Sequence, residues 1–387
     1  RMLLGRHIFK ACLVVGVASI SMTQVASAQE GLLDNFESIT IRLGTYARDD
    51  ASDGSKGNPF LDEDLAVVQP AIVFDYRLAD DWLLTTDFAI DRVSSASVER
   101  FGSRGNQSGA SGDVYIGLDF GLQWQSTPDR IWNYTLGYSG EYDYKSIGLG
   151  AGVSQDISGG QTQISLTVSG YFDQLDVIRA TGLDDGSDNR SSFSLTAKAY
   201  HILNPQAHAE FGLSITTQSG FLSTPYNSVF FREPGAGEDE WTDWGLANAV
   251  AGDELLPDSR LRNSLFGRLR WSLKEDLAVE LGGRIYSDDW GVQGLSLEPR
   301  LYLELGDAQV LRLRYRWYDQ TAADYFSDLV FSDTAEFMTQ DSDLGDWVSH
   351  TVGVGFESGD WHAALDYVTR SDDLNHLLFS VAKTWKF

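Results

Sequence analysis

The sequence has almost no cysteine, little proline and a shortage of positive charge. Its one cysteine, Cys12, lies in an apolar stretch near the N-terminus, so the rest of the chain forms no disulfide and offers no thiol for catalysis, metal or haem. The 29 lysines and arginines face 56 aspartates and glutamates, and the formal net charge of −27 argues against nucleic acid as a partner. Beyond the N-terminal stretch, no run of ~18 residues is both uncharged and predominantly apolar, as a membrane-spanning helix requires.

The N-terminus has the pattern of a secretory signal peptide. Basic residues at the start are followed by an uncharged run at 11–20 and by Ala26-Ser27-Ala28, a typical cleavage site. The apolar run is too short to cross ~30 Å of hydrocarbon. We therefore predict a cleaved signal peptide at 1–28, followed by a single domain at 29–387.

Aromatic residues, glycine and alternating polarity are what the chain has in quantity. Aromatic residues make up 12% of it, and 38 glycines stand against 8 prolines, a composition that suits many strands joined by turns. The mean hydropathy of −0.22 fits strands in which only every second residue faces lipid. We predict about sixteen alternating strands, each near the ~10 residues of a tilted membrane strand. They are 38–47, 65–78, 81–93, 112–125, 130–142, 145–157, 161–174, 191–203, 207–219, 259–273, 276–288, 292–305, 309–320, 346–358, 360–370 and 374–387.

The connections between these segments alternate between short and long. Short turns such as Ala79-Asp80, Asn204-Pro205-Gln206 and Lys274-Glu275 alternate with a more variable set that includes 220–258 and 321–345. Short turns at one end and longer loops at the other are typical of outer-membrane β-barrels. The sequence therefore predicts an all-β, transmembrane, antiparallel up-and-down barrel in the Gram-negative outer membrane, in contact with lipid and lipopolysaccharide.

The C-terminal stretch His376–Phe387, within the last predicted strand, has one apolar face and ends on an aromatic residue. Leu377, Phe379, Val381, Trp385 and Phe387 share a face that Lys383 interrupts. Such a strand is typical of the segment that closes an outer-membrane barrel and is read by the barrel-assembly machinery. The same stretch alone also fits an edge strand of a soluble sandwich.

Charged residues dominate the side of the strands that we expect to face the lumen. The later strands carry arginines there, and the earlier strands carry acids. The expected lumen residues are Arg260, Arg262, Arg268, Arg270, Arg284, Arg300, Arg312, Arg314 and Arg316 on one wall, and Asp75, Asp87, Asp91, Asp119, Glu141, Asp143 and Asp173 on the other. Opposed basic and acidic walls would set up a transverse field and orient polar solutes.

This pattern predicts a porin-like channel for small polar solutes, since about sixteen strands leave an aqueous lumen. Alternatively, the arginines pair with Glu280, Glu298 and Glu304 on neighbouring strands and fill the lumen with ion pairs. The acidic, aromatic loop 220–258 either folds inward as a constriction or forms an extracellular lid. Oligomeric state stays open.

Other chemistry has weaker signals. A hydrolase at the outer rim could use Ser349-His350, or His376 with Ser380, but neither lies in a recognisable motif. Asp/Gly/Ser clusters at 49–57 and 184–189 lack the full spacing of a calcium loop and are expected to be solvated turns. We therefore predict no enzyme activity, no cofactor and no metal site.

Four stretches resemble an uncharacterised Gram-negative family, a domain of unknown function (DUF-3570-like). They are EYDYKS at 141–146, LPDSR at 256–260, SDDWG at 287–291 and RWYDQTAADYF at 316–326. The resemblance implies an outer-membrane barrel of this length, and it carries no established activity or functional residues. Members of the family tend to be encoded beside flavin-transferase and thioredoxin-like proteins, which implies an alternative role as a structural or export barrel working with periplasmic redox or flavinylated partners.

Overall fold

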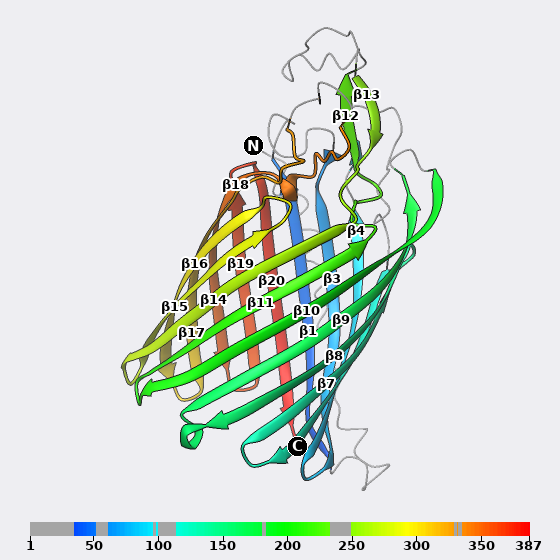
Figure 1. Cartoon of the computed structure of the whole chain (residues 1–387). Helices are drawn as coiled ribbons and strands as arrows, with labels where there is room; N and C mark the ends of the chain where they lie inside the picture. The colour runs from blue at the N-terminus through cyan, green and yellow to red at the C-terminus, as the bar shows by residue number, and fades with distance from the viewer. Residues whose placement is uncertain are drawn as a thin grey trace.

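The computed structural model describes residues 35–51, 61–95, 98–99, 114–179, 183–232, 249–328, 331 and 335–387. The predicted signal peptide lies outside these residues. In the described part, sixteen antiparallel strands close into a barrel in which each strand pairs with its neighbours along the chain and β1 pairs with β20 (Figure 1). Because the ring is closed, no strand edge is left unpaired.

The barrel strands are β1 (Phe36–Asp50), β3 (Leu65–Ala79), β4 (Trp82–Ser95), β6 (Val114–Thr127), β7 (Arg130–Gly140), β8 (Tyr144–Ile157), β9 (Thr162–Ile178), β10 (Asp184–Asn204), β11 (Ala207–Gly220), β14 (Ser259–Lys274), β15 (Leu277–Asp288), β16 (Gln293–Gly306), β17 (Gln309–Gln320), β18 (Trp347–Ser358), β19 (Trp361–Arg370) and β20 (Leu374–Lys386). Each predicted segment overlaps one of these strands. The predicted fold class, including the strand count, is confirmed.

Four short strands lie outside the barrel and were not predicted. They form two small sheets, β2 (Leu61–Asp62) with β5 (Val98–Glu99), and β12 (Ser228–Arg232) with β13 (Ala249–Asp253). Two 3-10 turns, η2 (Ser158–Gly160) and η5 (Ser342–Leu344), complete the described elements. No helix among the described residues is long and apolar enough to span a bilayer.

The alternating pattern sorts side chains between the two faces of the wall. On β14, Leu261, Leu265 and Leu269 are exposed on the outside, at 42%, 55% and 42%, whereas Ser264 on the inner face is buried. The same outward apolar register recurs around the ring, for example at Ile285 on β15. This apolar outer surface is the one expected to meet lipid.

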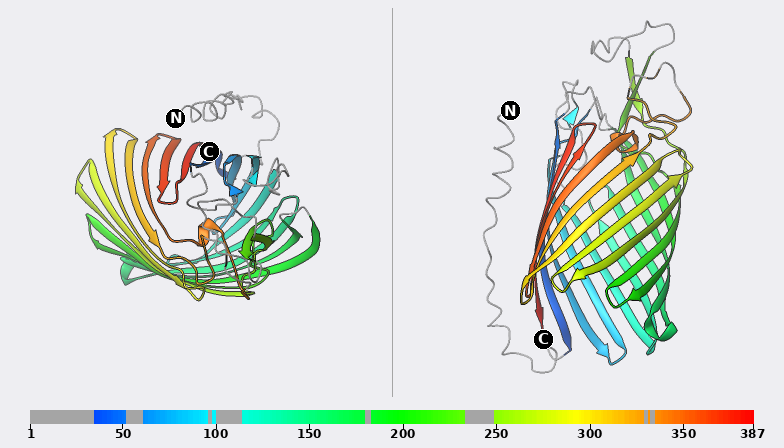
Figure 2. Two further views of the ribbon diagram at one scale, coloured as in Figure 1. Left: turned by 90° about the horizontal axis from the view of Figure 1, so that it is seen from above. Right: turned by 90° about the vertical axis from the view of Figure 1, so that its left-hand side faces the viewer.

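The two ends of the barrel differ, as the sequence predicted. At one end, the strands are joined by connections of two to four residues, such as those after β3, β10 and β14. The long connections, including 221–258 and 321–346, lie at the opposite end. Seen from that end, η5 lies inside the outline of the barrel (Figure 2). The segment around it, residues 339–345, is here called the mouth segment.

Candidate functional site

All nine predicted lumen arginines lie on four consecutive strands, β14 to β17. On each strand they alternate with residues whose apolar side chains are exposed outside, such as Leu313 and Tyr315 on β17 and Leu295 and Leu297 on β16. The inward register therefore holds the arginines, and together they form a basic wall.

Five of these arginines have carboxylate partners. Arg260 pairs with Asp288, Arg268 lies 3.6 Å from Glu210, and Arg300 lies 2.9 Å from Glu280. Arg314 bridges Glu298 at 3.2 Å and Asp366 at 3.3 Å, and Arg316 lies 4.0 Å from Glu298. Glu280 and Glu298 are thus partners, as the plugged-lumen alternative required, whereas Glu304 makes no ion pair in the described part of the chain.

The other four arginines have no carboxylate within 4.0 Å among the described residues. Arg262 donates to the hydroxyl of Tyr286 at 2.9 Å, and Arg270 lies over the ring of Tyr302 at 4.0 Å. Arg284 and Arg312 have neither an ion pair nor a side-chain hydrogen bond within the described residues. The basic wall therefore keeps uncompensated positive charge.

Four of the predicted acids lie on strands opposite the basic wall, namely Asp75 on β3, Asp87 and Asp91 on β4, and Asp119 on β6. Asp87 on β4 and Asp119 on β6 face each other in register, and Arg42 lies 3.6 Å from Asp87. In the barrel order, β4 stands eight places from β15 and β6 eight places from β16, so these acids lie across the lumen from the arginines.

Glu141 lies outside the strands. The segment predicted at 130–142 ends at Gly140 as β7, and the amide of Glu141 donates to the carbonyl of Tyr144 at 2.8 Å. This bond closes the turn to β8, so Glu141 and Asp143 belong to the loop end and not to the inward register of a strand.

The ion pairs join strands that lie close together in the barrel wall. Among the described residues, every ion pair between two different barrel strands joins strands that are first or second neighbours in the ring. The charged side chains thus pair along the inner surface and do not meet from opposite walls.

A chamber of about 400 Å³ lies in the basic wall below the mouth segment. Its lining combines four arginines, aromatic rings and small residues. These are Arg260, Arg262, Arg284, Tyr286, Val292, Gly294, Ser296, Arg316, Tyr318, Gln320, Asp343, Leu344 and Trp347.

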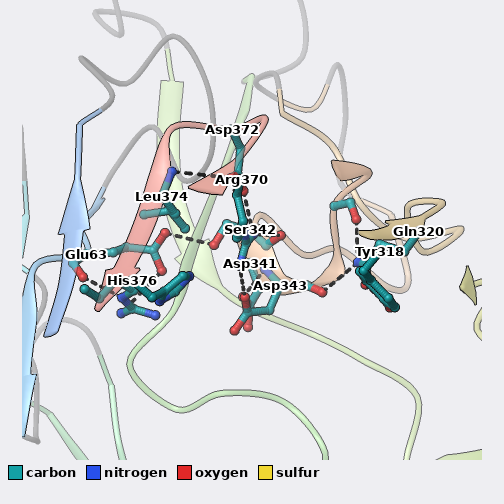
Figure 3. A network of polar contacts seen from close by, with 12 residues as sticks. Glu63, Tyr318, Gln320, Asp341, Ser342, Asp343, Arg370, Asp372, Leu374 and His376 are labelled. Atoms are coloured by element: carbon teal, nitrogen blue, oxygen red, sulfur yellow. Dashed lines mark hydrogen bonds and ion pairs between the residues drawn. The ribbon is translucent and has the colours of Figure 1, made fainter. Parts of the chain in front are cut away.

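The mouth segment is fixed to the barrel by polar contacts from several elements (Figure 3). At the end of β19, Arg370 pairs with Asp343 at 2.6 Å and donates to the carbonyl of Ser342 at 3.1 Å. The hydroxyl of Ser342 donates to Glu63 at 2.8 Å, and Gln320 donates to the carbonyl of Gly345 at 2.7 Å. This network could not be predicted from the sequence, because its members come from distant segments with no shared pattern.

Burial raises the pKa of three carboxyl groups in or beside this segment. Burial raises the pKa of Glu63 and of Glu254 to about 7 in each case. It also raises the pKa of Asp341 to about 6, with the neighbouring Asp343 acting in the same direction. The mouth therefore contains groups that titrate near neutral pH.

Loop 220–258 was predicted either to fold inward or to form a lid. Its hairpin β12–β13 rises away from the barrel (Figure 1), and its acids from Glu233 to Asp243 lie outside the described residues. The described acid Glu254 is buried and accepts from Thr339 at 2.6 Å, so it meets the mouth segment and not the arginine wall.

The predicted serine–histidine candidates do not form pairs. Ser349 is buried and His350 exposed, on opposite faces of β18. His350 shares a hydrogen bond with Tyr315 at 2.8 Å, and His376 shares one with Tyr46 at 2.6 Å. Each histidine ring is thus engaged by a tyrosine.

No group of three or more histidine, cysteine, aspartate or glutamate residues in the described chain is arranged to hold a metal ion. Most of the cluster at 49–57 lies outside the described residues, and Asp185 of the cluster at 184–189 pairs with Arg179 at 2.9 Å.

The closed ring, its apolar exterior and its charged interior define a transmembrane β-barrel of sixteen strands. The chain belongs to the family described as "Protein of unknown function (DUF3570)", whose model matches residues 112–368. The family resemblance seen in the sequence is thus confirmed. No curated protein matches the chain.

Several solved outer-membrane proteins are similar in fold. The siderophore receptor PirA from Pseudomonas aeruginosa has 11% identity and a TM-score of 0.41, over 86% of this chain and 55% of the receptor. The PirA receptor from Acinetobacter baumannii has 12% identity and a TM-score of 0.42, over 86% and 52%. A bacterial polysaccharide outer membrane secretin has 12% identity and a TM-score of 0.49, over 90% and 98%. The chain spans about half the length of these receptors, and the likeness is one of fold alone.

Proposed function

We propose that this chain is an outer-membrane channel through which small polar solutes cross without chemical change. The basic wall on β14–β17 and the acidic wall on β4 and β6 act as fixed charges that create a transverse field across the lumen. A solute that carries a dipole or opposite charges aligns in such a field, and a net anion is drawn toward the basic wall.

The observation that carries this proposal is the direction of the ion pairs. Arginines that met acids from the opposite wall would fill the lumen with side chains. The described pairs instead join first or second neighbours along the wall, as Arg314 does with Glu298 and Asp366. The plugged-lumen alternative also requires pairs between neighbouring strands, but these pairs lie along the wall. Four of the nine arginines have no carboxylate within 4.0 Å among the described residues. Together these two facts support a lumen lined by charge over one filled with ion pairs.

The test is single-channel conductance of the refolded protein in a planar bilayer. The wild type is compared with two single variants, one that removes a charge from the basic wall and one that removes a charge from the acidic wall. Arg312→Gln and Asp119→Asn are matched, because neither side chain has an ion pair among the described residues. At about 7 Å in water, a unit charge is worth about 0.6 kcal/mol, so each variant should change the permeability of a monovalent anion and that of a cation about 2- to 3-fold each, in opposite directions. The anion-to-cation permeability ratio should then change about 7-fold. The two variants should shift the ratio in opposite directions.

Folding is checked by heat-modifiable mobility on gels. A folded wild-type barrel that carries no current would refute the channel. Steady current with the same ion selectivity in all three proteins would refute the role of the charged walls while leaving a pore.

A further inference from the structure

The chamber in the basic wall exists because two small residues on β16 lie between long side chains on the neighbouring strands. On β16, Gly294 pairs with Tyr286 on one side and Gln320 on the other, and Ser296 pairs with Arg284 and Tyr318. A Cβ atom on Gly294 would lie 2.9 Å from the hydroxyl of Tyr318. Two small residues between long ones thus leave a recess of about 400 Å³, within the range of small-molecule sites.

The acids at the chamber are already engaged. The carboxylate of Asp288 is fully buried, pairs with Arg260, and accepts from the hydroxyl of Tyr286 at 2.7 Å. Its second oxygen accepts from the amides of Trp290 at 3.0 Å and Val292 at 2.9 Å. This leaves Asp288 little capacity to neutralise another arginine.

The other acids near the chamber also have arginine partners already. Asp343 pairs with Arg370, and Glu298, at 4.0 Å from Arg316, also pairs with Arg314. The guanidinium groups of Arg262 and Arg284 therefore line one recess, and neither has a carboxylate within 4.0 Å among the described residues. Like charges gathered in a partly desolvated recess repel each other, and a bound anion removes that cost.

The other side of the chamber is aromatic. The rings of Tyr318 and Trp347 lie 4.9 Å apart at 45°, and the buried indole N–H of Trp347 has no acceptor among the described residues. The flat aromatic rings can pack against the carbon skeleton of a solute, and the guanidinium groups can donate paired hydrogen bonds to an oxyanion.

We propose that this chamber binds a small organic phosphate, with its phosphate group on Arg262, Arg284 and Arg316 and its carbon skeleton against Tyr318 and Trp347. A phosphate monoester carries about −1.5 to −2 charges near neutral pH and three acceptor oxygens, which matches two uncompensated guanidinium groups. Charge-assisted bonds from arginine to phosphate are among the strongest available in proteins. The inference rests on the proposed function, since it names the solute class that the lumen selects.

The experiment is isothermal titration of the folded barrel with glucose 6-phosphate, and with glucose, inorganic phosphate and succinate as comparison probes. Glucose 6-phosphate should bind most tightly and glucose should not bind. Arg284→Gln should weaken binding at least about 10-fold, since it removes a charge-assisted contact. Arg284 has no ion pair or side-chain hydrogen bond in the described chain, so this change spares the fold.

Arg270→Gln is the matched control. Arg270 also lacks a carboxylate partner and faces the same lumen, but it does not line the chamber. Its replacement should leave the Kd for glucose 6-phosphate within about 2-fold, because screening by salt limits the reach of a charge outside the site. Equal weakening by both variants would overturn the site and indicate a general effect of lumen charge.

The probes separate the remaining outcomes. Equal affinity for inorganic phosphate would overturn the contribution of the aromatic rings, and equal affinity for succinate would overturn selection of phosphate. Absence of binding in a barrel with ion-selective conductance would refute the chamber and leave the channel. Binding by a barrel that conducts no current would support the chamber and refute the channel.

Discussion

Raising the pH from 5 to 8 should loosen the mouth segment. Glu63 receives a hydrogen bond from Ser342 while the segment is seated, and burial then raises its pKa from 4.5 to about 7. Arg48 on β1 opposes this shift, while Asp341 and Asp343 of the mouth segment reinforce it. When the segment lifts away and Glu63 meets water, we expect its pKa to return toward the ordinary value.

The sign follows from proton binding. Between pH 4.5 and 7, the seated state holds more protons than the lifted state, so seating is favoured at low pH and weakens as pH rises through this window. The difference of 2.5 between the two pKa values sets a ceiling of about 3.4 kcal/mol for Glu63 alone, or roughly 300-fold in the seating equilibrium. Glu254, with its pKa also raised to about 7, contributes in the same direction.

Amide hydrogen exchange measures this directly. The amides of Leu344 and Gly345 donate to the carbonyls of Asp341 and Ser342 at 2.9 and 3.1 Å, so they are protected while the segment keeps this turn. After correction for the intrinsic pH dependence of exchange, their protection should fall between pH 5 and 8, whereas that of β14 amides should stay constant. Glu63→Gln should make the protection of these amides depend less on pH, because glutamine can still accept a hydrogen bond from Ser342 but does not titrate. Protection that is constant, or that rises with pH, would refute the reasoning.

Three substitutions test the packing of the barrel by urea unfolding in lipid vesicles. Trp290→Ala should cost about 3–5 kcal/mol, because this ring is only 3% exposed and lies 4.2 Å below the guanidinium of Arg260; a loss under about 1 kcal/mol would contradict this. Leu265→Arg should cost about 2–4 kcal/mol if Leu265 faces lipid near the midplane, and a neutral result would place it in water. Gly353→Ala should cost about 1–3 kcal/mol, since its Cβ would lie 1.9 Å from an oxygen of Asp366, and unchanged stability would mean that Asp366 moves freely.

The strands could be predicted from the sequence because their signal is local. Alternation along 259–273 identifies β14 and its inward arginines without knowledge of any other strand, since side chains alternate between the two faces. Lys383 interrupts the apolar face of β20, and the structure explains why a lysine lies there. Its ammonium group lies 5.0 Å from the ring centres of both Trp361 and Trp385, a cation–π arrangement that a single-strand pattern cannot reveal.

The mouth segment and the chamber could not be predicted, because both depend on contacts between distant parts of the chain. Ser342 and Glu63 are separated by 279 positions, and neither belongs to a periodic stretch. The chamber requires the register that brings Ser296 between Arg284 and Tyr318. A shift of one residue in that pairing would turn these side chains to the other face. Strands β12 and β13 were missed because five residues carry too little alternation.

In an up-and-down barrel, strands that follow one another in the sequence are neighbours in the wall. Like charges that cluster along the sequence therefore cluster on one side of the lumen. Because β14 to β17 follow one another in the chain, their arginines gather on one wall, and the strands that carry Asp87 and Asp119 stand eight places away in the ring. The mouth segment joins the last of these basic strands to β18, and its Asp343 lines the chamber while pairing with Arg370. While the segment is seated, this carboxylate therefore lies at the chamber and repels an anion that binds there. By reciprocity, if a bound anion favours the lifted segment, then conditions that lift the segment favour binding of the anion by the same factor.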